Sequence, residues 1–320
     1  MKPFLPLLAV SLLVFQIPRA QESIPTAPTA TGTLQDPQLD ELSGMAASRR
    51  YPGLLYAHND SGDSARLFLI KPSGETVAQI QLKGAYARDW EDMTLAGEHV
   101  YVGDIGDNLG WRDAIQIYRF KEPALDPQKL NQNLEIAPET FAVRYPGGPR
   151  DAETLLAAPD GRLWILSKDK DGSSLFAARF EAGKTRTLAR IGAKIRFGAT
   201  GQRTTLATGG DFSPDGRKFV VTTLSQIHEW KLPAPFEVSN LANLKPVIRA
   251  LPSLRQCESV CYSADGKQII VSSEGAGAPL FALPSAFRWR FKGIEEGKKG
   301  NLVKCSLLSF SPSSIPTKTP

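Results

Sequence analysis

The stretch Arg88-Asp89-Trp90-Glu91-Asp92-Met93 returns twice further along the chain. Its counterparts are Arg150-Asp151-Ala152-Glu153-Thr154-Leu155 and Arg255-Gln256-Cys257-Glu258-Ser259-Val260. Each copy has the form Arg-x-x-Glu-x-apolar and opens a strand-like run of residues. Three such copies in a chain of 320 residues predict a protein built from repeated units.

The repeat can be followed over most of the chain. One register places five residues at the same position: Ser43, Glu91, Glu153, Thr208 and Glu258. The spacing lies near 50 residues, and short alternating strands with frequent turns fill each unit, with no convincing amphipathic helix. Such a period is typical of β-propeller blades with four strands each, so we expect an all-β propeller.

The third unit shows the expected strands most clearly. They are Thr154–Ala158, Leu163–Ser167, Leu175–Phe180 and Thr187–Ile191. Asp-Gly turns at 160–161, 215–216 and 265–266 lie between two apolar runs in the third, fourth and fifth units. Asp-Gly is a strong hairpin signal because glycine readily adopts positive φ.

One segment carries a resemblance to known families. Phe212-Ser213-Pro214-Asp215-Gly216-Arg217-Lys218-Phe219-Val220-Val221 resembles the repeat of TolB-like and WD40-like bacterial β-propellers, and similar blade openings extend over residues 43–283. Together with Asn59-Asp60-Ser61-Gly62-Asp63 and Gly103-Asp104-Ile105-Gly106-Asp107-Asn108, the set resembles secreted bacterial propellers of unassigned function. The resemblance implies the fold, whereas function must be argued from a site.

We expect five blades in a propeller over residues 33–285. Leu280–Leu283 would be the third strand of the last blade, and Thr31–Leu39 would supply its fourth strand and close the ring. The alternative is six blades, with Phe287–Ser309 forming a degenerate one. We favour a C-terminal tail over 286–320, partly disordered, because the end of the chain is rich in Ser, Pro and Thr.

The N-terminus has the pattern of a secretory signal over residues 1–20. Lys2 precedes an apolar run from Phe4 to Ile17, and a small residue, Ala20, follows. An uncleaved anchor is the alternative, because Pro18 is unfavourable at its position before a cleavage site. Residues 21–32 are expected to be a flexible leader. The predicted location is therefore periplasmic or secreted, with no transmembrane segment beyond the signal.

Charge and cysteines limit the possible partners. The net charge of +5 includes two cations of the leader, and the remainder is too mild to suggest nucleic acid. Three cysteines, Cys257, Cys261 and Cys305, cannot all pair with one another. We expect small buried side chains, and a disulfide with Cys305 stays open. We expect a monomer that binds a small molecule, a glycan or a protein.

Blade topology sorts the acidic residues by face. Segments that enter the innermost strands share a face with the loops between second and third strands. That face should carry the following acids: Asp60, Asp63, Asp89, Glu91, Asp92, Asp104, Asp107, Asp151, Glu153, Asp169, Asp171, Glu258 and Glu274. Glu91, Glu153 and Glu258 begin innermost strands, so they should surround the channel mouth. A rim of one charge sign implies a cationic partner or compensating arginines.

The first functional hypothesis is a binding module with a cation site on this face. Calcium prefers six to eight oxygen ligands, and the candidates are Asp60, Glu91, Asp104, Asp107 and Glu153. The wider set of binding candidates is Glu91, Glu153, Glu258, Asp92, Asp104, Arg88, Arg150 and Trp90. The alternative explanation is structural: Arg88, Arg150 and Arg255 would pair with the neighbouring Glu in the ring.

The second functional hypothesis is a metal-dependent hydrolase on the same face, of lactonase, phosphatase or glycosidase type. Convergent carboxylates suit such chemistry, whereas no Gly-x-Ser-x-Gly motif or Gly-rich phosphate loop is present. His58 is the candidate general base, although a single histidine more often makes a structural hydrogen bond. Trp90, Trp111, Tyr86 and Tyr145 should flank this face.

Overall fold

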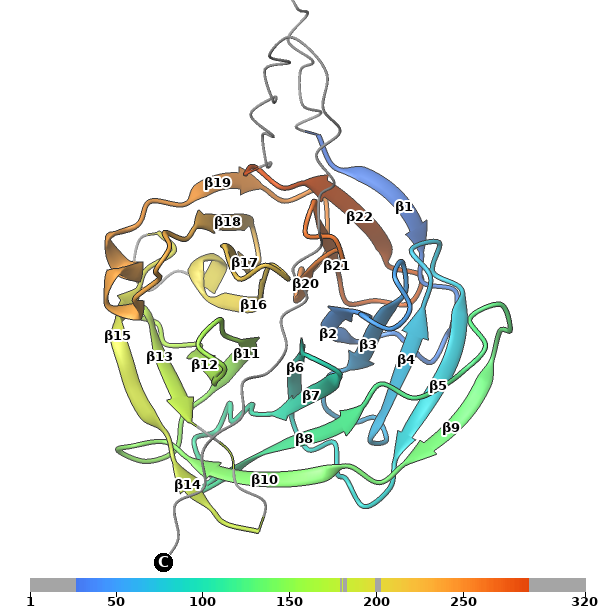
Figure 1. The fold of residues 1–320 in the computed structure, drawn as a ribbon, viewed down its shortest axis with the longest axis horizontal. Coiled ribbons are helices and arrows are strands. Elements are labelled where there is room, and N and C mark those ends of the chain that lie inside the picture. Colours follow the sequence, from blue (N-terminus) through green and yellow to red (C-terminus); the bar gives the residue numbers. More distant parts are fainter. Residues whose placement is uncertain (1–26, 179, 181–182, 199–202, 288–320) are drawn as a thin grey trace, which may run out of the picture. The chain divides into compact units, whose positions relative to one another are not determined.

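In the computed structural model, the described residues are 27–287, without 179, 181–182 and 199–202. They form five sheets around a central axis (Figure 1). The innermost strands contact one another in ring order. They are β2 (Leu42–Ala47), β6 (Trp90–Ala96), β11 (Ala152–Ala157), β16 (Ala207–Phe212) and β20 (Ser259–Tyr262). The prediction of a five-bladed β-propeller is confirmed.

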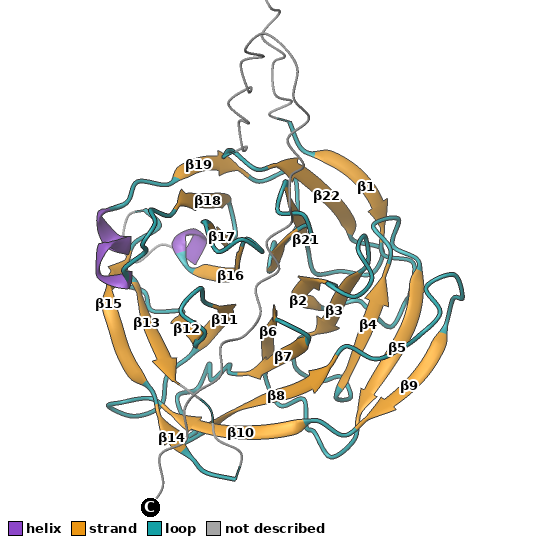
Figure 2. Cartoon of the chain, in the orientation of Figure 1, coloured by secondary structure: helices purple, strands orange, loops and turns teal. Residues whose placement is uncertain are grey.

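The other strands follow outward from the axis, and Figure 2 shows that almost every regular element is a strand. Blade 1 continues with β3 (Leu55–Asn59), β4 (Arg66–Ile70) and β5 (Thr76–Leu82), and blade 2 with β7 (His99–Asp104), β8 (Ile115–Lys121) and β10 (Glu139–Arg144). Blade 3 adds β12 (Leu163–Ser167), β13 (Ser173–Ala178) and β15 (Ala189–Ile195). Blade 4 adds β17 (Lys218–Thr223), β18 (Gln226–Lys231) and β19 (Val247–Ala250), and blade 5 adds β21 (Gln268–Ser272) and β22 (Pro279–Pro284).

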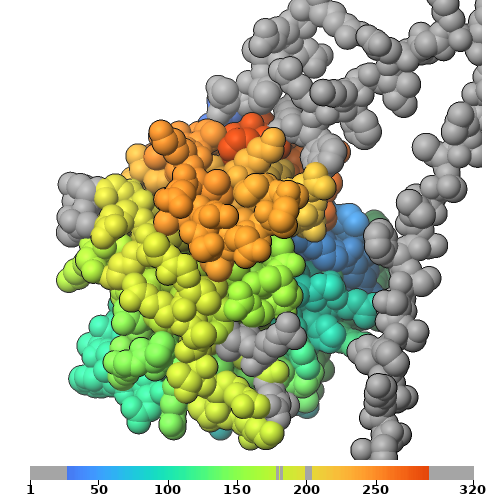
Figure 3. Space-filling model, turned by 60° about the vertical axis from the view of Figure 1, so that its left-hand side comes forward, coloured from blue at the N-terminus to red at the C-terminus, as the bar shows by residue number. Residues whose placement is uncertain are grey.

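Helical structure in the described part is limited to two short 3-10 helices, η1 (Arg203–Thr205) and η2 (Val238–Asn243). None of the helices described is long and apolar enough to cross a membrane. The outer rim of blades 3 and 4, yellow and orange in Figure 3, is formed by β15, η2 and β19.

The N-terminal strand completes the last blade. β1 (Thr29–Thr33) pairs antiparallel with β22, so the first strand of the described residues lies beside the last (Figure 1). The expected closure therefore occurs, slightly earlier than the predicted range Thr31–Leu39. Residues from Thr29 onward were expected in a flexible leader; they are instead ordered by backbone hydrogen bonds to β22. The signal segment, Cys305 and the tail from residue 288 lie outside the described residues.

Two blades carry an additional outer strand. β9 (Gln132–Ile136) pairs parallel with β5, so a segment between the third and fourth strands of blade 2 extends blade 1. β14 (Arg186–Thr187) pairs parallel with β10 and extends blade 2. The single strand predicted over Thr187–Ile191 is wrong, because the chain leaves one sheet at Thr187 and enters another at Ala189, with Leu188 buried between them.

The repeat register has a structural counterpart. The first four innermost strands each contain a register irregularity at the aligned residue: Ser43, Glu91, Glu153 and Thr208. Glu258 directly precedes β20. A β-bulge inserts one extra residue into a strand and redirects its side chain. The aligned residues are all buried, so the four bulges and the entry of β20 place the repeated side chain inside the fold in every blade.

The core lies between neighbouring blades. Trp90 on β6 packs against His58 of blade 1, with ring centroids 5.5 Å apart, and against Tyr118 of its own blade. Trp164 of blade 3 contacts Phe212 of blade 4 at 5.4 Å. Cys257 and Cys261 are buried free thiols, as expected for small core side chains. Stacked blades thus hold the channel-facing strands in fixed positions.

Candidate functional site

Three ring glutamates surround one lysine at the channel mouth. Glu91, Glu153 and Glu258 are 4%, 4% and 7% exposed. Lys168 forms an ion pair with Glu153, and its charge acts on both Glu91 and Glu258. The convergence of these glutamates follows from the bulge register, whereas Lys168 was not among the sequence candidates.

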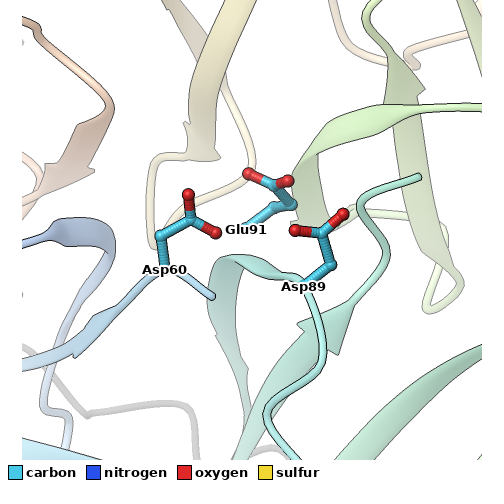
Figure 4. A group of neighbouring side chains, drawn as sticks. All are labelled: Asp60, Asp89 and Glu91. Carbon is cyan, nitrogen blue, oxygen red and sulfur yellow. The ribbon is translucent and has the colours of Figure 1, made fainter. Parts of the chain in front are cut away.

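A compact carboxylate cluster lies beside this ring. Asp60 follows β3, Asp89 precedes β6, and Glu91 sits at the bulge of β6. One oxygen from each lies within 4.8 Å of the others, and Figure 4 shows the three carboxylates facing a common space. Asp60 accepts a hydrogen bond from the backbone N–H of Ser61 at 2.5 Å. Within the described residues, the carboxylates of Asp89 and Glu91 have no hydrogen bond and no ion pair.

Burial and mutual repulsion raise the pKa of every carboxyl in the cluster. Burial, reinforced by the charges of Asp89 and Glu274, raises the pKa of Asp60 to about 6. Burial raises the pKa of Glu91 well above its usual value, and the charges of Asp60 and Asp89 add to the shift. The pKa of Asp89 rises through burial and the charge of Asp151. Bringing a cation among these oxygens would remove the repulsion that causes part of these shifts.

Gly106 makes room for the cluster. A Cβ at this position would lie 2.1 Å from Oε1 of Glu91 and 2.6 Å from Oδ2 of Asp89. Any side chain would therefore displace the two carboxylates. The backbone N–H of Gly106 donates to the carbonyl of Asp89 at 3.1 Å, which ties the loop after β7 to the segment that enters β6.

Two of the predicted metal ligands brace this loop. Asp104 forms an ion pair with Arg112 at 2.9 Å and accepts the backbone N–H of Asp89 at 3.0 Å. The carboxylate of Asp107 accepts the backbone N–H groups of Trp111 and Arg112, at 2.9 and 3.0 Å. Oδ1 of Asp104 and both carboxylate oxygens of Asp107 are thus engaged in contacts within this segment.

The idea that the motif arginines pair with the neighbouring glutamates of the ring is wrong for the described residues. Arg150 binds Asp169 through both carboxylate oxygens, at 2.6 and 2.8 Å. Arg88 and Arg255 are exposed and form no ion pair in the described structure. The reason is the geometry of strand entry. The arginine lies in the segment before the strand, whereas the glutamate turns inward.

Three further sequence candidates belong to the framework. Asp92 is buried and accepts backbone N–H groups from Met93 and from Leu155 of the next blade, at 2.8 and 2.9 Å. His58 is fully buried, and burial lowers its pKa to about 4, so the ring is neutral. A Cβ on Gly44 would lie 2.0 Å from its Nε2. Trp90 is 1% exposed and separates blades 1 and 2.

Glu258 forms a second acidic pair with Glu274. Burial raises the pKa of Glu258 to about 8, and the hydrogen bond and charge of Glu274 contribute to the rise. Gln256 donates to Oε1 of Glu258 at 2.7 Å. One proton can therefore be retained by this pair near neutral pH.

A cleft of about 650 Å³ adjoins the cluster. Asp89 belongs to both. The lining residues are Ser61, Arg88, Asp89, Asp107, Asn108, Leu109, Trp111, Arg112, Asp113 and Ala114. Its size is in the usual range of small-molecule sites.

The cluster could hold a divalent cation. Three carboxylates offer up to six oxygens, and calcium accepts mono- or bidentate carboxylates with water completing the shell. Asp60 and Glu91 were sequence candidates for this role. Asp89 was placed on the acidic face but not proposed as a ligand, although it stands two residues before Glu91 and shares its entry segment.

Comparisons with known proteins concern the fold. No family model and no curated protein matches the sequence. Among solved structures, the PQQ-bound aldose sugar dehydrogenase from Streptomyces coelicolor is similar, with a TM-score of 0.44 and 11% identity over 82% of this chain and 99% of that chain. A gluconolactonase from Xanthomonas campestris has a TM-score of 0.41 and 12% identity, covering 76% of this chain and 72% of that chain. The five sheets themselves place the chain among β-propellers.

Proposed function

We propose that the protein is a β-propeller binding module that holds a divalent cation, calcium first, at its channel mouth. Asp60, Asp89 and Glu91 are the proposed protein ligands. The observation that carries the proposal is that Asp89 and Glu91 lack partners in the described structure although Glu91 is 4% exposed. Burying an ionised group without a partner is costly, and a bound cation offsets that cost.

The N-terminal sequence supports a place of action outside the cytoplasm. Residues 1–20 have the pattern of a secretory signal. Extracellular calcium modules work with dissociation constants on the order of 10⁻⁴–10⁻³ M. A site with three carboxylates and water ligands therefore suits a periplasmic or secreted protein.

Thermal unfolding with and without calcium tests the proposal. Since calcium binds the folded state, a concentration of about 100 Kd should stabilise it by about 2.7 kcal/mol. The Tm should rise by roughly 5–10 °C for a domain of this size. Glu91→Gln should abolish the rise, since it removes a ligand charge at nearly constant volume.

Asp160→Asn is the matched control. Asp160 lies in the β11–β12 turn, at the end of an innermost strand opposite to the cluster, and pairs with Arg162 at 2.6 Å. This variant should keep the full calcium response. An unchanged Tm of the wild-type protein across millimolar calcium would rule out the cation site.

A metal-dependent hydrolase is the second candidate, because burial raises the pKa of Glu258 to about 8, so this carboxyl can donate a proton near neutral pH. A carboxylic acid that keeps its proton near neutral pH can act as a general acid. Glu258→Gln should then abolish hydrolysis of a simple sugar lactone or phosphate ester while the calcium-dependent rise in Tm persists. Absence of turnover in the calcium-loaded wild type leaves the binding module as the function.

A further inference from the structure

Two large apolar side chains are exposed at the cleft beside the cluster. Trp111 is 79% exposed and Leu109 is 67% exposed. Six large hydrophobic side chains are exposed in the described part of the chain, and these two line the same cleft. Exposed apolar side chains gathered at a concave site are typical of ligand contacts rather than of chance exposure.

The backbone of Trp111 is held in place although its side chain is exposed. The Asp107 carboxylate binds its backbone N–H, and the N–H of Asp107 donates to Oδ1 of Asp151 in the next blade, at 2.9 Å. Arg112 donates to the carbonyl oxygens of Gly106 and Asp104, at 2.6 and 3.0 Å. The loop is therefore fixed to two blades, and the backbone that carries the indole has a set position. Pre-organisation of this kind lowers the entropy cost of binding.

Arg88 supplies a cation at the same cleft. It is exposed, lines the cleft, and has no ion pair or hydrogen bond in the structure described. The other cleft arginine, Arg112, is neutralised by Asp104. A guanidinium without a partner can receive a carboxylate or phosphate through two parallel hydrogen bonds.

The remaining lining is polar and offers both donors and acceptors. Ser61, Asn108, Asp89 and Asp113 surround the single indole. A sugar ring carries hydroxyl groups on its edge and C–H groups on its face. The hydroxyl groups match the polar lining of the cleft, and the C–H face matches the indole. The acidic residues would repel an anion, unless a cation at Asp89 reduces their charge.

We propose that this cleft binds a monosaccharide carrying an anionic group, with the sugar ring against Trp111 and the carboxylate or phosphate on Arg88. The proposal rests on the cation site, since the cation at Asp89 lowers the negative charge that the sugar anion meets. Calcium and ligand should therefore strengthen each other's binding.

Titration of the calcium-loaded full chain with four sugars tests the proposal. Glucuronate and glucose 6-phosphate represent the two anionic groups, glucose is their neutral counterpart, and mannitol is an acyclic control. Tryptophan fluorescence and calorimetry report binding. At least one anionic sugar should bind roughly tenfold or more tightly than glucose, given the strength of hydrogen bonds between charged groups. Which one binds identifies the anion.

Two variants and one control complete the test. Arg88→Gln should remove the preference for the anionic sugar, and Trp111→Ala should weaken that sugar and glucose alike, by roughly three- to tenfold. Arg162→Gln is the control, because Arg162 lies in the β11–β12 turn, away from the cleft. It should change neither the preference for the anionic sugar nor the affinity for glucose. Equal affinity of wild type and Arg88→Gln for the anionic sugars, or no binding of any sugar, would refute the sugar site. If the Tm still rises with calcium in that case, the cation site stands without it.

Discussion

Two buried glutamates of this propeller, Glu229 and Glu91, differ in the number of hydrogen-bond donors around them. Glu229 on β18 has a side chain that is 0% exposed, and Arg249 binds it at 3.1 Å. Tyr262, Ser285 and the backbone N–H of Ala286 also donate to it, at 3.1, 2.6 and 2.8 Å. These donors come from β19, β20 and the segment after β22, so the glutamate joins blades 4 and 5.

Glu91 is almost as deeply placed, yet its neighbours are other carboxylates and Lys168, and its pKa is raised well above the usual value. The difference teaches how to separate structural from functional acids in one ring. A buried carboxylate that accepts a full set of hydrogen bonds stabilises the fold. A buried carboxylate that lies among other acids and accepts no hydrogen bond in the described structure is available to a ligand.

The same substitution at both positions should produce the largest contrast. Glu229→Gln should destabilise the chelator-treated protein by about 3–5 kcal/mol, because Arg249, which is mostly buried, would lose its counter-charge. Glu91→Gln should be neutral or stabilising, because it removes repulsion. Urea unfolding measures both. Equal losses would erase the distinction between the two sites.

The pH dependence of the cluster gives a smaller effect. The pKa of Asp60 is raised from 3.8 to about 6, so the folded state binds this proton more tightly than the unfolded state does. The resulting stabilisation of the folded state is complete below pH 3.8 and is lost as the pH rises through about 6. Without calcium, the free energy of unfolding of the wild type should rise by roughly 1–3 kcal/mol relative to that of Asp60→Asn as the pH falls through this window. A pH-independent difference between the two proteins would contradict the raised pKa.

The smallest expected effect concerns Asp89. In chelator, Asp89→Asn should change stability by no more than about 0.5 kcal/mol, because its carboxylate has no hydrogen bond in the described structure to lose. The same variant should weaken the calcium-dependent rise in Tm. A large loss of stability without calcium would mean that Asp89 supports the fold, as Glu229 does.

Much of the fold could be predicted from the repeats. The aligned residues from Ser43 to Thr208 fall on β-bulges, and the Asp-Gly turns have glycine φ values of 76°, 64° and 67° at Gly161, Gly216 and Gly266. These features depend on local backbone chemistry, which sequence encodes directly. The parallel outer strands β9 and β14 were missed because their pairing partners lie in other blades, and short polar strands give no signal of where they dock.

The site could be predicted only in part. Convergence of the ring glutamates followed from the repeat, and Asp60 and Glu91 do meet. The repeat does not predict which carboxylates are left without an ion pair or hydrogen bond. That depends on Arg112 bracing Asp104 and on Lys168 pairing with Glu153, and both contacts come from loops outside the repeated motif.

The pairing of β1 with β22 sets an order of events in biosynthesis. Residues 29–33 leave the ribosome early, but the edge they must join is absent until Pro284 has been made. The circle therefore closes only after nearly the whole propeller has been synthesised. A circular permutant that links β22 to β1 and opens the chain between two other strands should keep every sheet intact. A different strand would then be the last to find its partner during synthesis.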